Sequence, residues 1–326
     1  MSVQATEAQP EPALVADEAC SPQEAEPVDP GSPDRPEDRA WHARLPAPRT
    51  ALTHAVLIAG ALVMVGPLVW MVLTSFKTAA DAAAFFDTPR RLWAVVQGLW
   101  PDPVTLENYR AVFDERPMGR YFINSIIYTL LRMGPSLLFC SLAGFVFAKL
   151  EFRWSYVLFW ALVGTMMIPF QIKMLTLYEM MVDFGWINTY WGLISIRLME
   201  PFGIFLFRQT IMGIPDDLID AARIDGCGPL RTYYNVILPL IKPTLAAYSI
   251  FLFMWTWNDF LWPLLVVNSE ALKPLELGIL SFSDINNPDY VKMMAASTVA
   301  VAPVIAFFLA MQRHFIRGVT MTGLKG

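Results

Sequence analysis

The feature that most constrains this fold is a series of long apolar runs separated by polar segments. The first run, residues 51–76, contains no formally charged side chain. It exceeds the roughly 20 residues that a helix needs to cross a bilayer. Hydrophobic residues make up 55% of the chain and charged residues only 16%, which is too apolar for an ordinary soluble protein. The sequence therefore predicts an all-α membrane protein.

Six apolar runs are candidates for transmembrane helices. They cover residues 51–76, 121–148, 154–172, 188–207, 243–267 and 293–312. Arg132 interrupts the second run, and Asp259 lies in the later half of the fifth. The fourth run is the weakest because Arg197, Glu200 and Pro201 fall inside it. Six spans place both termini on the same side of the membrane.

The acidic charge of the chain is concentrated at its N-terminus. Residues 1–50 hold ten carboxylates and four arginines, a net charge of −6, while the whole chain has a net charge of −5. The same segment is rich in Pro, Glu and Ala, a composition that buries too little apolar area to offset the entropy of ordering. It predicts a disordered tail followed by a membrane domain, 51–326. Because the remainder carries only +1, no nucleic-acid partner is expected.

The distribution of basic residues predicts the orientation of the chain. With the tail inside, twelve Lys and Arg residues fall on the cytoplasmic side and eight outside. Cytoplasmic segments carry the excess of basic residues in multi-pass proteins. We therefore expect a multi-pass protein of the bacterial cytoplasmic membrane, with both termini and residues 214–243 in the cytoplasm.

Residues 214–243 form the only long polar interruption in the second half of the chain. Pro215 suits a first helical position, and the two aspartates after it suit the first turn. Gly226 can adopt the left-handed conformation that ends a helix and reverses the chain. A second arm opens at Pro229 and carries apolar residues at helical spacing up to a proline: Leu230, Tyr233, Tyr234, Ile237, Leu238 and Pro239. The pattern predicts a hairpin of two short helices, which either docks on a partner or packs on its own protein.

Three runs in this hairpin resemble the cytoplasmic loop of the membrane permeases of bacterial ABC importers: Asp220-Ala221-Ala222, Gly226, and Ile237-Leu238-Pro239. That family carries Glu-Ala-Ala, a glycine four residues on and a later Ile-x-Leu-Pro, so Asp220 is one methylene shorter than the usual glutamate. Cys227 and Gly228 also depart from the commoner residues. The resemblance implies that the following residues couple the protein to an ATPase: Asp220, Ala221, Ala222, Asp225, Gly226 and Pro239.

The resemblance extends from about Tyr109 to Gly326 and is closest to the carbohydrate-importer permeases of the MalG type. The runs that carry it are Asn124-Ser125, Leu142-Ala143, 166–169, 188–193, 201–205, 257–264, 312–320 and the terminal Lys325-Gly326. The acidic tail and the charged residues within or beside the apolar runs depart from the pattern: Arg132, Lys173, Arg197 and Glu200.

On this resemblance the chain is a type I importer permease with six transmembrane helices and a cytoplasmic coupling hairpin. It would form half of the pathway of an ATP-driven sugar importer. The implied partners are an ATP-binding subunit, a second permease in a heterodimer, an extracytoplasmic sugar-binding protein that meets residues 268–292, and membrane lipid. The segment after Arg317 would reach the ATPases. No cofactor is implied.

The chain lacks the residues for hydrolysing ATP itself. Its nearest approach to a phosphate-binding loop is 318–325, where Leu324 precedes the lysine and no Ser or Thr follows. The three histidines lie in or beside different terminal segments, and the three cysteines show neither disulfide nor metal-ligand spacing. We therefore expect no catalytic set and no metal site, with ATP hydrolysis on another chain.

The best candidates for contact with solute are Trp255, Asn258, Asp259 and Trp262. At positions i, i+4 and i+7, the two tryptophans and Asp259 would share one face of a continuous helix. Aromatic faces beside hydrogen-bonding groups suit a sugar ring. The alternative is that the tryptophans anchor the helix at the membrane interface while Asp259 braces a neighbouring helix.

Arg197 and Glu200 stand at i and i+3, where opposite charges can pair on one helix face. Burying such a pair is costly, so we expect it to face the bundle interior or a wet cavity. Either pathway lining or bracing explains it, and Arg132 is a possible third member.

An alternative function is an ion-gradient-driven secondary transporter, with Asp259 or the Arg197–Glu200 pair in a proton relay. The hairpin discriminates between the two, because a self-contained carrier would not need it. A non-transporting membrane scaffold is a third, weaker possibility. The sequence leaves open which sugar or glycerol phosphate is carried and what the acidic tail does.

Overall fold

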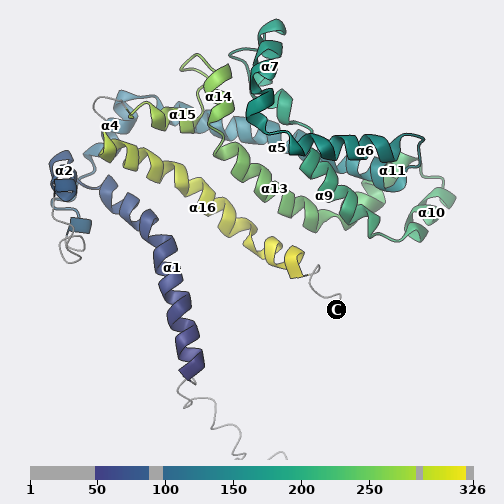
Figure 1. Cartoon of the computed structure of the whole chain (residues 1–326), viewed down its shortest axis with the longest axis horizontal. Coiled ribbons are helices and arrows are strands. Elements are labelled where there is room, and N and C mark those ends of the chain that lie inside the picture. The colour runs from purple at the N-terminus through teal and green to yellow at the C-terminus, as the bar shows by residue number, and fades with distance from the viewer. Residues whose placement is uncertain (1–47, 88–97, 284–288, 321–326) are drawn as a thin grey trace, which may run out of the picture. The chain divides into compact units, whose positions relative to one another are not determined.

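The computed structural model describes residues 48–87, 98–283 and 289–320, and every regular element among them is helical (Figure 1). The predicted disordered tail lies outside these residues except for its last three, as do residues 321–326 at the C-terminus. The α-helices are α1 Pro48–Ser75, α2 Ala79–Asp87, α4 Glu107–Glu115, α5 Met118–Lys149, α6 Ser155–Gly164, α7 Phe170–Asp183, α8 Tyr190–Ile194, α9 Pro201–Met212, α10 Asp216–Ile224, α11 Pro229–Thr232, α12 Leu238–Leu240, α13 Lys242–Trp257, α14 Leu261–Val266, α15 Leu275–Leu280 and α16 Tyr290–Thr320. Three short elements lie between them: the 3-10 turns η1 Thr165–Met167 and η2 Ser195–Arg197, and the π-helical turn η3 Tyr233–Ile237. The all-helical prediction is confirmed.

The chain divides into two units, residues 1–62 and 63–326, and α1 runs across the boundary. In the first unit, the described part of α1 exposes apolar side chains such as Leu52, Leu57 and Leu62. Leucine side chains of this kind suit a lipid environment.

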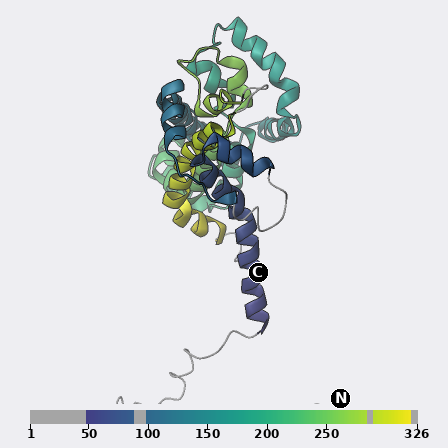
Figure 2. The ribbon, with the colours of Figure 1, turned by 90° about the vertical axis from the view of Figure 1, so that its left-hand side faces the viewer.

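In the second unit α5 is the central element. It packs against α9 and α13, and α13 packs in turn against α16 (Figures 1 and 2). Gly144 of α5 makes its crossing with α9 close, because a Cβ atom there would lie only 2.6 Å from Cβ of Phe207. The core at this crossing includes Phe145 and Tyr248, both fully buried or nearly so. A residue larger than glycine at position 144 would push α9 away from α5.

Three helices are long and apolar enough to cross a membrane unbroken: Thr50–Ser75, Met118–Lys149 and Tyr290–Met311. Three further candidates are pairs bent at a short break: Ser155–Met167 with Phe170–Asp183 at 104°, Tyr190–Arg197 with Pro201–Met212 at 45°, and Pro229–Leu240 with Lys242–Trp257 at 80°. The count reaches six if each bent pair is one span. The expected spans 154–172 and 188–207 each contain such a break, and the expected span 243–267 is interrupted between Trp257 and Leu261, so none of the three is one continuous helix. The last pair also contains the second arm of the hairpin.

Prolines explain two of the interruptions. The residue before a proline is pushed out of the helical region, and a proline suits the first position of a new helix. Accordingly Ile168, before Pro169, is extended, and α9 begins at Pro201 after the extended Glu200. No proline lies at the break between Trp257 and Leu261, where α13 ends and α14 begins. That interruption could not have been placed from local signals.

Helices α10 and α15 lie at opposite ends of α5 (Figure 1). If α15 lies at the outer face of the membrane, the hairpin, at the other end of α5, should lie at the cytoplasmic face. In a variant with its three native cysteines replaced by serine, Ser283→Cys and Ile224→Cys both place a thiol at an exposed position.

For these two variants we expect a membrane-impermeant maleimide added to intact cells to label position 283 only. Both positions should react after the membrane is opened, which controls for accessibility. Labelling of position 224 in sealed cells would reverse the proposed orientation.

Candidate functional site

The hairpin of residues 214–243 closes its first arm with a C-terminal cap made by the backbone. Gly226 has a φ of 75°, and its N–H donates to the carbonyl of Arg223 at 2.9 Å. The N–H of Cys227 donates to the carbonyl of Ala222 at 2.9 Å. This pair of bonds is a Schellman motif, which favours glycine at the left-handed position. The predicted turn is confirmed, although α10 begins at Asp216, with Pro215 just before its first turn.

Helix α10 has one face on the protein and one face open. Ile219 and Ala222 are buried, whereas Ile224 is 86% exposed. Asp220 and Arg223 form an exposed ion pair at 3.1 Å. Of the predicted coupling residues, only Ala222 packs inward. The others are exposed: Asp220, Ala221, Asp225, Gly226 and Pro239. The hairpin therefore packs on its own protein and also presents a free surface.

The second arm does not end at Pro239 as expected. A proline inside a helix clashes with the carbonyl four residues earlier and lacks an N–H. Here the π-helical turn η3 precedes it, and the N–H of Leu238 donates to the carbonyl of Tyr233. This wider turn accommodates the proline, so that the helical path continues through Leu240. The apolar stripe divides: Tyr233 and Ile237 are fully buried, and the other side of the arm remains exposed.

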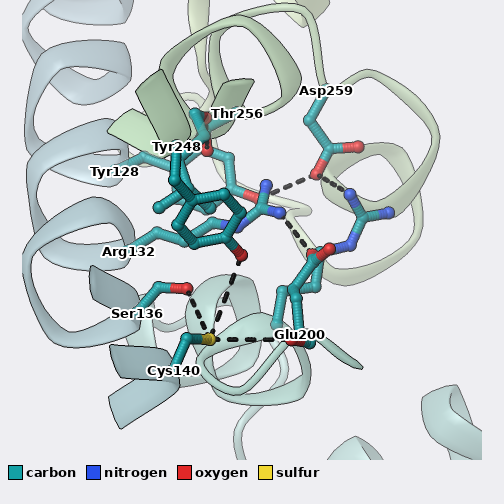
Figure 3. Close-up of polar contacts among 10 residues, drawn as sticks. Tyr128, Arg132, Ser136, Cys140, Glu200, Tyr248, Thr256 and Asp259 are labelled. Carbon is teal, nitrogen blue, oxygen red and sulfur yellow. Dashed lines mark hydrogen bonds and ion pairs between the residues drawn. The ribbon is translucent and has the colours of Figure 1, made fainter. Parts of the chain in front are cut away.

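A second group of polar residues lies inside the bundle, on one face of α5. Tyr128, Arg132, Ser136 and Cys140 are spaced every four residues and are all buried (Figure 3). We call these four residues the polar face of α5. Sequence reasoning identified only Arg132 among them. The four-residue spacing of polar side chains within an apolar run was the signal that could have found the others.

Arg132 pairs with Glu200 across the bundle. Its Nη2 atom donates to Oε1 of Glu200 at 2.6 Å, and the arginine side chain is fully buried while that of Glu200 is 23% exposed. Among the described residues no protein atom accepts a hydrogen bond from Nε or Nη1 of Arg132. A buried guanidinium with one partnered nitrogen is costly, and ionisable residues within membrane helices generally face a bundle interior or a water-filled cavity.

The Cys140 thiol lies beside the break that precedes α9, next to Glu200. Its Sγ atom is 3.6 Å from the carbonyl oxygen of Glu200 and 3.9 Å from the hydroxyl of Tyr248 on α13 (Figure 3). The residue that precedes α9 is thus held by α5 through both its side chain and its backbone.

Asp259 occupies the second break, between α13 and α14. Its Oδ2 atom accepts a hydrogen bond from the hydroxyl of Tyr128 at 2.8 Å and lies 3.3 Å from Nη1 of Arg197. Arg197 also stacks over the ring of Phe170 at 4.7 Å. The expected pairing of Arg197 with Glu200 on one helix face was wrong, because the chain leaves the helix before Pro201 and each residue pairs elsewhere.

The predicted solute-contact residues do not share one helix face, because the helix is interrupted at Asn258. Trp262 is fully buried and its indole N–H donates to the carbonyl of Gly192 at 2.8 Å. Trp255 is partly exposed beside Phe202, with ring centroids 5.7 Å apart. The side chain of Asn258 donates to the carbonyl of Met254. Of the four predicted residues, Trp255 and Asn258 are the two at the surface.

At the end of α5 away from the hairpin, polar side chains hold the segment that follows α14. Asn188 has a φ of 60°, and its Oδ1 accepts the N–H of Ser269 at 3.0 Å. The Nδ2 atom of Asn124 donates to the carbonyls of Ala271 and Lys273 at 2.9 and 3.0 Å. Both asparagines belong to the runs that carried the resemblance, so those runs fix the start of the predicted binding-protein loop.

Glu270 lies within this same segment. Hydrogen bonds from Lys273 and from Tyr121 lower the pKa of the Glu270 carboxyl from its usual value. At the end of α5 away from the hairpin, the segment therefore carries a carboxylate that accepts hydrogen bonds from two donors.

Comparison with known proteins assigns the family. The sequence profile described as "Binding-protein-dependent transport system inner membrane component" matches residues 113–321. The chain belongs to this family. It is accordingly a multi-pass transport permease, and the matched region contains the hairpin and the polar face of α5.

Two relatives and one solved structure illustrate the similarity. The arabinooligosaccharides transport system permease protein AraQ of Halalkalibacterium halodurans is 33% identical, with 82% of this chain and 93% of the relative covered. The sn-glycerol-3-phosphate transport system permease protein UgpE of Brucella abortus is 30% identical over 82% and 95%. A chain of a bacterial ABC transporter for alginate import has the same fold, with a TM-score of 0.70 at 21% identity, covering 84% of this chain and 100% of that one.

The Arg132–Glu200 pair can be tested by a double-mutant cycle. Glu200→Gln removes the carboxylate partner of a buried guanidinium, and breaking a buried pair costs about 3–5 kcal/mol. Because Glu200 is 23% exposed, we expect the low end of that range or less. The same change in an Arg132→Met background should cost under about 1 kcal/mol, since no buried charge is then left unpaired.

The measurement is thermal unfolding of the purified protein in detergent, followed by tryptophan fluorescence. Asp220→Asn is the control because its pair with Arg223 is exposed on both sides, and it should change stability by less than about 1 kcal/mol. Equal costs of Glu200→Gln in the two backgrounds would show that the pair contributes no coupling energy.

Proposed function

We propose that this protein is one of two permease subunits, paired as a heterodimer, of an ATP-driven importer for a carbohydrate or a glycerol phosphate. Its hairpin docks on a separate ATP-binding subunit, and an extracytoplasmic binding protein delivers the solute near residues 268–292. The named transport systems of its relatives support this substrate class. ATP-driven closure of the ATPase subunits then moves the hairpin and changes which side of the pathway is open.

The observation that carries the proposal is the two-sided hairpin. One side holds Ile219, Tyr233 and Ile237 in the core of the bundle, whereas the other exposes Ile224 and Leu230. Exposed apolar side chains gathered on a polar hairpin are typical of a surface that binds another protein. The buried side connects that surface to the transmembrane helices.

The paired charges at the two helix breaks are proposed to line or gate the pathway. Intramembrane ionisable residues generally face a bundle interior or a cavity, and they often mark a solute route. Arg132 and Arg197 hold the carboxylates that flank α9 and α13. Rearranging these pairs would move the breaks relative to α5. The partly exposed Trp255 and Asn258 are proposed to contact solute.

Reconstitution separates this proposal from an ion-gradient carrier. The purified chain alone in liposomes should move no solute. Adding its ATPase, paired permease and binding protein should restore uptake that requires ATP hydrolysis and ignores proton or sodium gradients. Asp259→Asn in this assembly should change the rate or affinity of uptake without creating gradient dependence. Solute accumulation by the isolated chain under a proton gradient alone would establish the carrier instead.

Docking is tested at Gly226. A Cβ atom there meets nothing within 4 Å, so Gly226→Leu should strain the turn through its φ of 75° and project a side chain from the hairpin surface. The left-handed backbone costs about 1–2 kcal/mol for a residue other than glycine. We expect normal abundance in the membrane, at least tenfold weaker association with the ATPase and little uptake.

Gly185→Leu is the matched control for that substitution. Gly185 also has a positive φ, 66°, and a Cβ atom there would likewise meet nothing within 4 Å, but it lies outside the hairpin. The variant should carry the same backbone strain and leave ATPase association unchanged. Normal association of the Gly226→Leu variant would mean that the hairpin is not the docking element.

A further inference from the structure

The first turn of the hairpin is joined to the last residue of α5 by one side chain. Nζ of Lys149 donates to the carbonyl of Ile214 at 2.6 Å and to Oδ1 of Asp216 at 2.6 Å. The lysine side chain is only 6% exposed, although that of Asp216 is 79% exposed. A lysine at a helix C-terminus commonly interacts with the last carbonyls of its own helix. Here the ammonium group binds another element instead. We call its two hydrogen bonds, to the Ile214 carbonyl and to Asp216, the Lys149 tie.

The other contacts that hold α10 lack this directionality. Ile219 packs in the apolar core that includes Phe145 and Tyr233, and Ala222 is also buried. Apolar burial is non-directional and tolerates sliding of one surface over another. A hydrogen bond from Lys149 to a backbone carbonyl requires a defined distance and angle, so it fixes the position of α10 along its own axis.

A groove of about 1070 Å³ beside Lys149 makes this tie more important. Its walls come from the end of α5, residues 150–153, 155 and 156, Arg208 of α9, and a side of α10 that carries the buried Ile219 and exposed charged side chains. Side chains of α10 therefore do not fill the space against the 150–156 segment. Lys149 bridges the elements at the edge of this open groove.

Helix α5 connects this tie to the charged pairs in the bundle. It is continuous from Met118 to Lys149. Lys149 lies 17 positions after Arg132, which is about 26 Å along a helix that rises about 1.5 Å per residue. A displacement of α10 that is passed to Lys149 therefore reaches Arg132, and with it the Glu200 break, through one unbroken helix.

We propose that Lys149 is the positioning residue that transmits movement of the coupling hairpin to α5, and through α5 to the paired charges of the bundle. This inference rests on the proposed function. Without the tie, α10 still docks on the ATPase and ATP is still hydrolysed, but the helix moves without carrying α5 with it. The result is ATP hydrolysis uncoupled from solute uptake.

The test uses the complete reconstituted assembly and measures ATP hydrolysed and solute imported in the same vesicles. For Lys149→Met we expect normal association with the ATPase, ATP hydrolysis within twofold of the unsubstituted protein, and at least tenfold less uptake. Lys149→Arg keeps a long cationic donor and should restore uptake to within about threefold. Asp216→Asn should reduce uptake by about two- to threefold, because it removes one of the two acceptors of Lys149 while the Ile214 carbonyl remains available.

Arg153→Met is the matched control. Arg153 lines the same groove and carries the same charge, but it stacks over Trp154 and makes no ion pair with α10 within the described residues. The ratio of ATP hydrolysed to solute imported should stay within twofold. The conservative rescue and this control separate a positioning role from a general loss of charge at the groove.

Two results would overturn the inference. One is a Lys149→Met assembly that imports solute with an unchanged ratio of ATP hydrolysed to solute imported. The other is loss of ATPase association in that variant, which would assign Lys149 a purely structural role. If Lys149→Met does not reach the membrane, the solvent-exposed Asp216→Asn carries the test, and an unchanged ATP ratio there overturns the inference. Failure of the unsubstituted assembly to import solute with ATP contradicts the proposed function itself and is distinguishable from both.

Discussion

A charged side chain inside an apolar helix bundle must find a partner, and in this protein α5 meets that requirement for the helices around it. Its polar face contacts the two places where the neighbouring chain leaves helical geometry, before α9 and after α13. Backbone groups at such breaks lose their intrahelical bonds and need polar surroundings. Arg132 and Tyr128 supply charge and hydrogen bonds there, from a helix that has no break of its own among its 32 residues. The positions of the broken helices therefore depend on an unbroken one.

The same helix also contacts the hairpin at one end and the segment that precedes α15 at the other. At one end Tyr121 and Asn124 hold the segment that precedes α15, and at the other Lys149 holds the hairpin. Close packing makes these connections effective, because densely packed protein interiors transmit strain. The tight crossing at Gly144 has the same consequence, because α9 cannot shift far toward α5. A single continuous helix with polar contacts along its length thus links surfaces that would otherwise behave independently.

The sequence predicted the parts of this structure that local chemistry determines. The first arm of the hairpin and its turn were placed correctly because a helix start near Pro215 and a left-handed Gly226 depend on neighbouring residues only. Pairings between helices could not be predicted from neighbouring residues alone. Arg197 and Glu200 were expected to pair because they are three residues apart, yet a break separates them and their partners lie 62 and 68 positions away in the chain. Trp262 was placed near solute by helical spacing, but the interruption after Trp257 turns it into the core.

The exposed side of the hairpin also bears on which of its residues would contribute to the proposed docking. The sequence motif directs attention to the carboxylate of Asp220, which already pairs with Arg223 at the surface. Exposed pairs of this kind contribute about 0–1 kcal/mol, so exchanging one partner for another gains little. The larger contribution available to a partner is the apolar area of Ile224, Leu230 and Tyr234, which are 86%, 61% and 50% exposed. Burying a large apolar side chain completely contributes about 1.5–3 kcal/mol. If the hairpin docks in an ATPase cleft, apolar contacts therefore supply most of its affinity, and the shorter carboxylate at position 220 is tolerable for that reason.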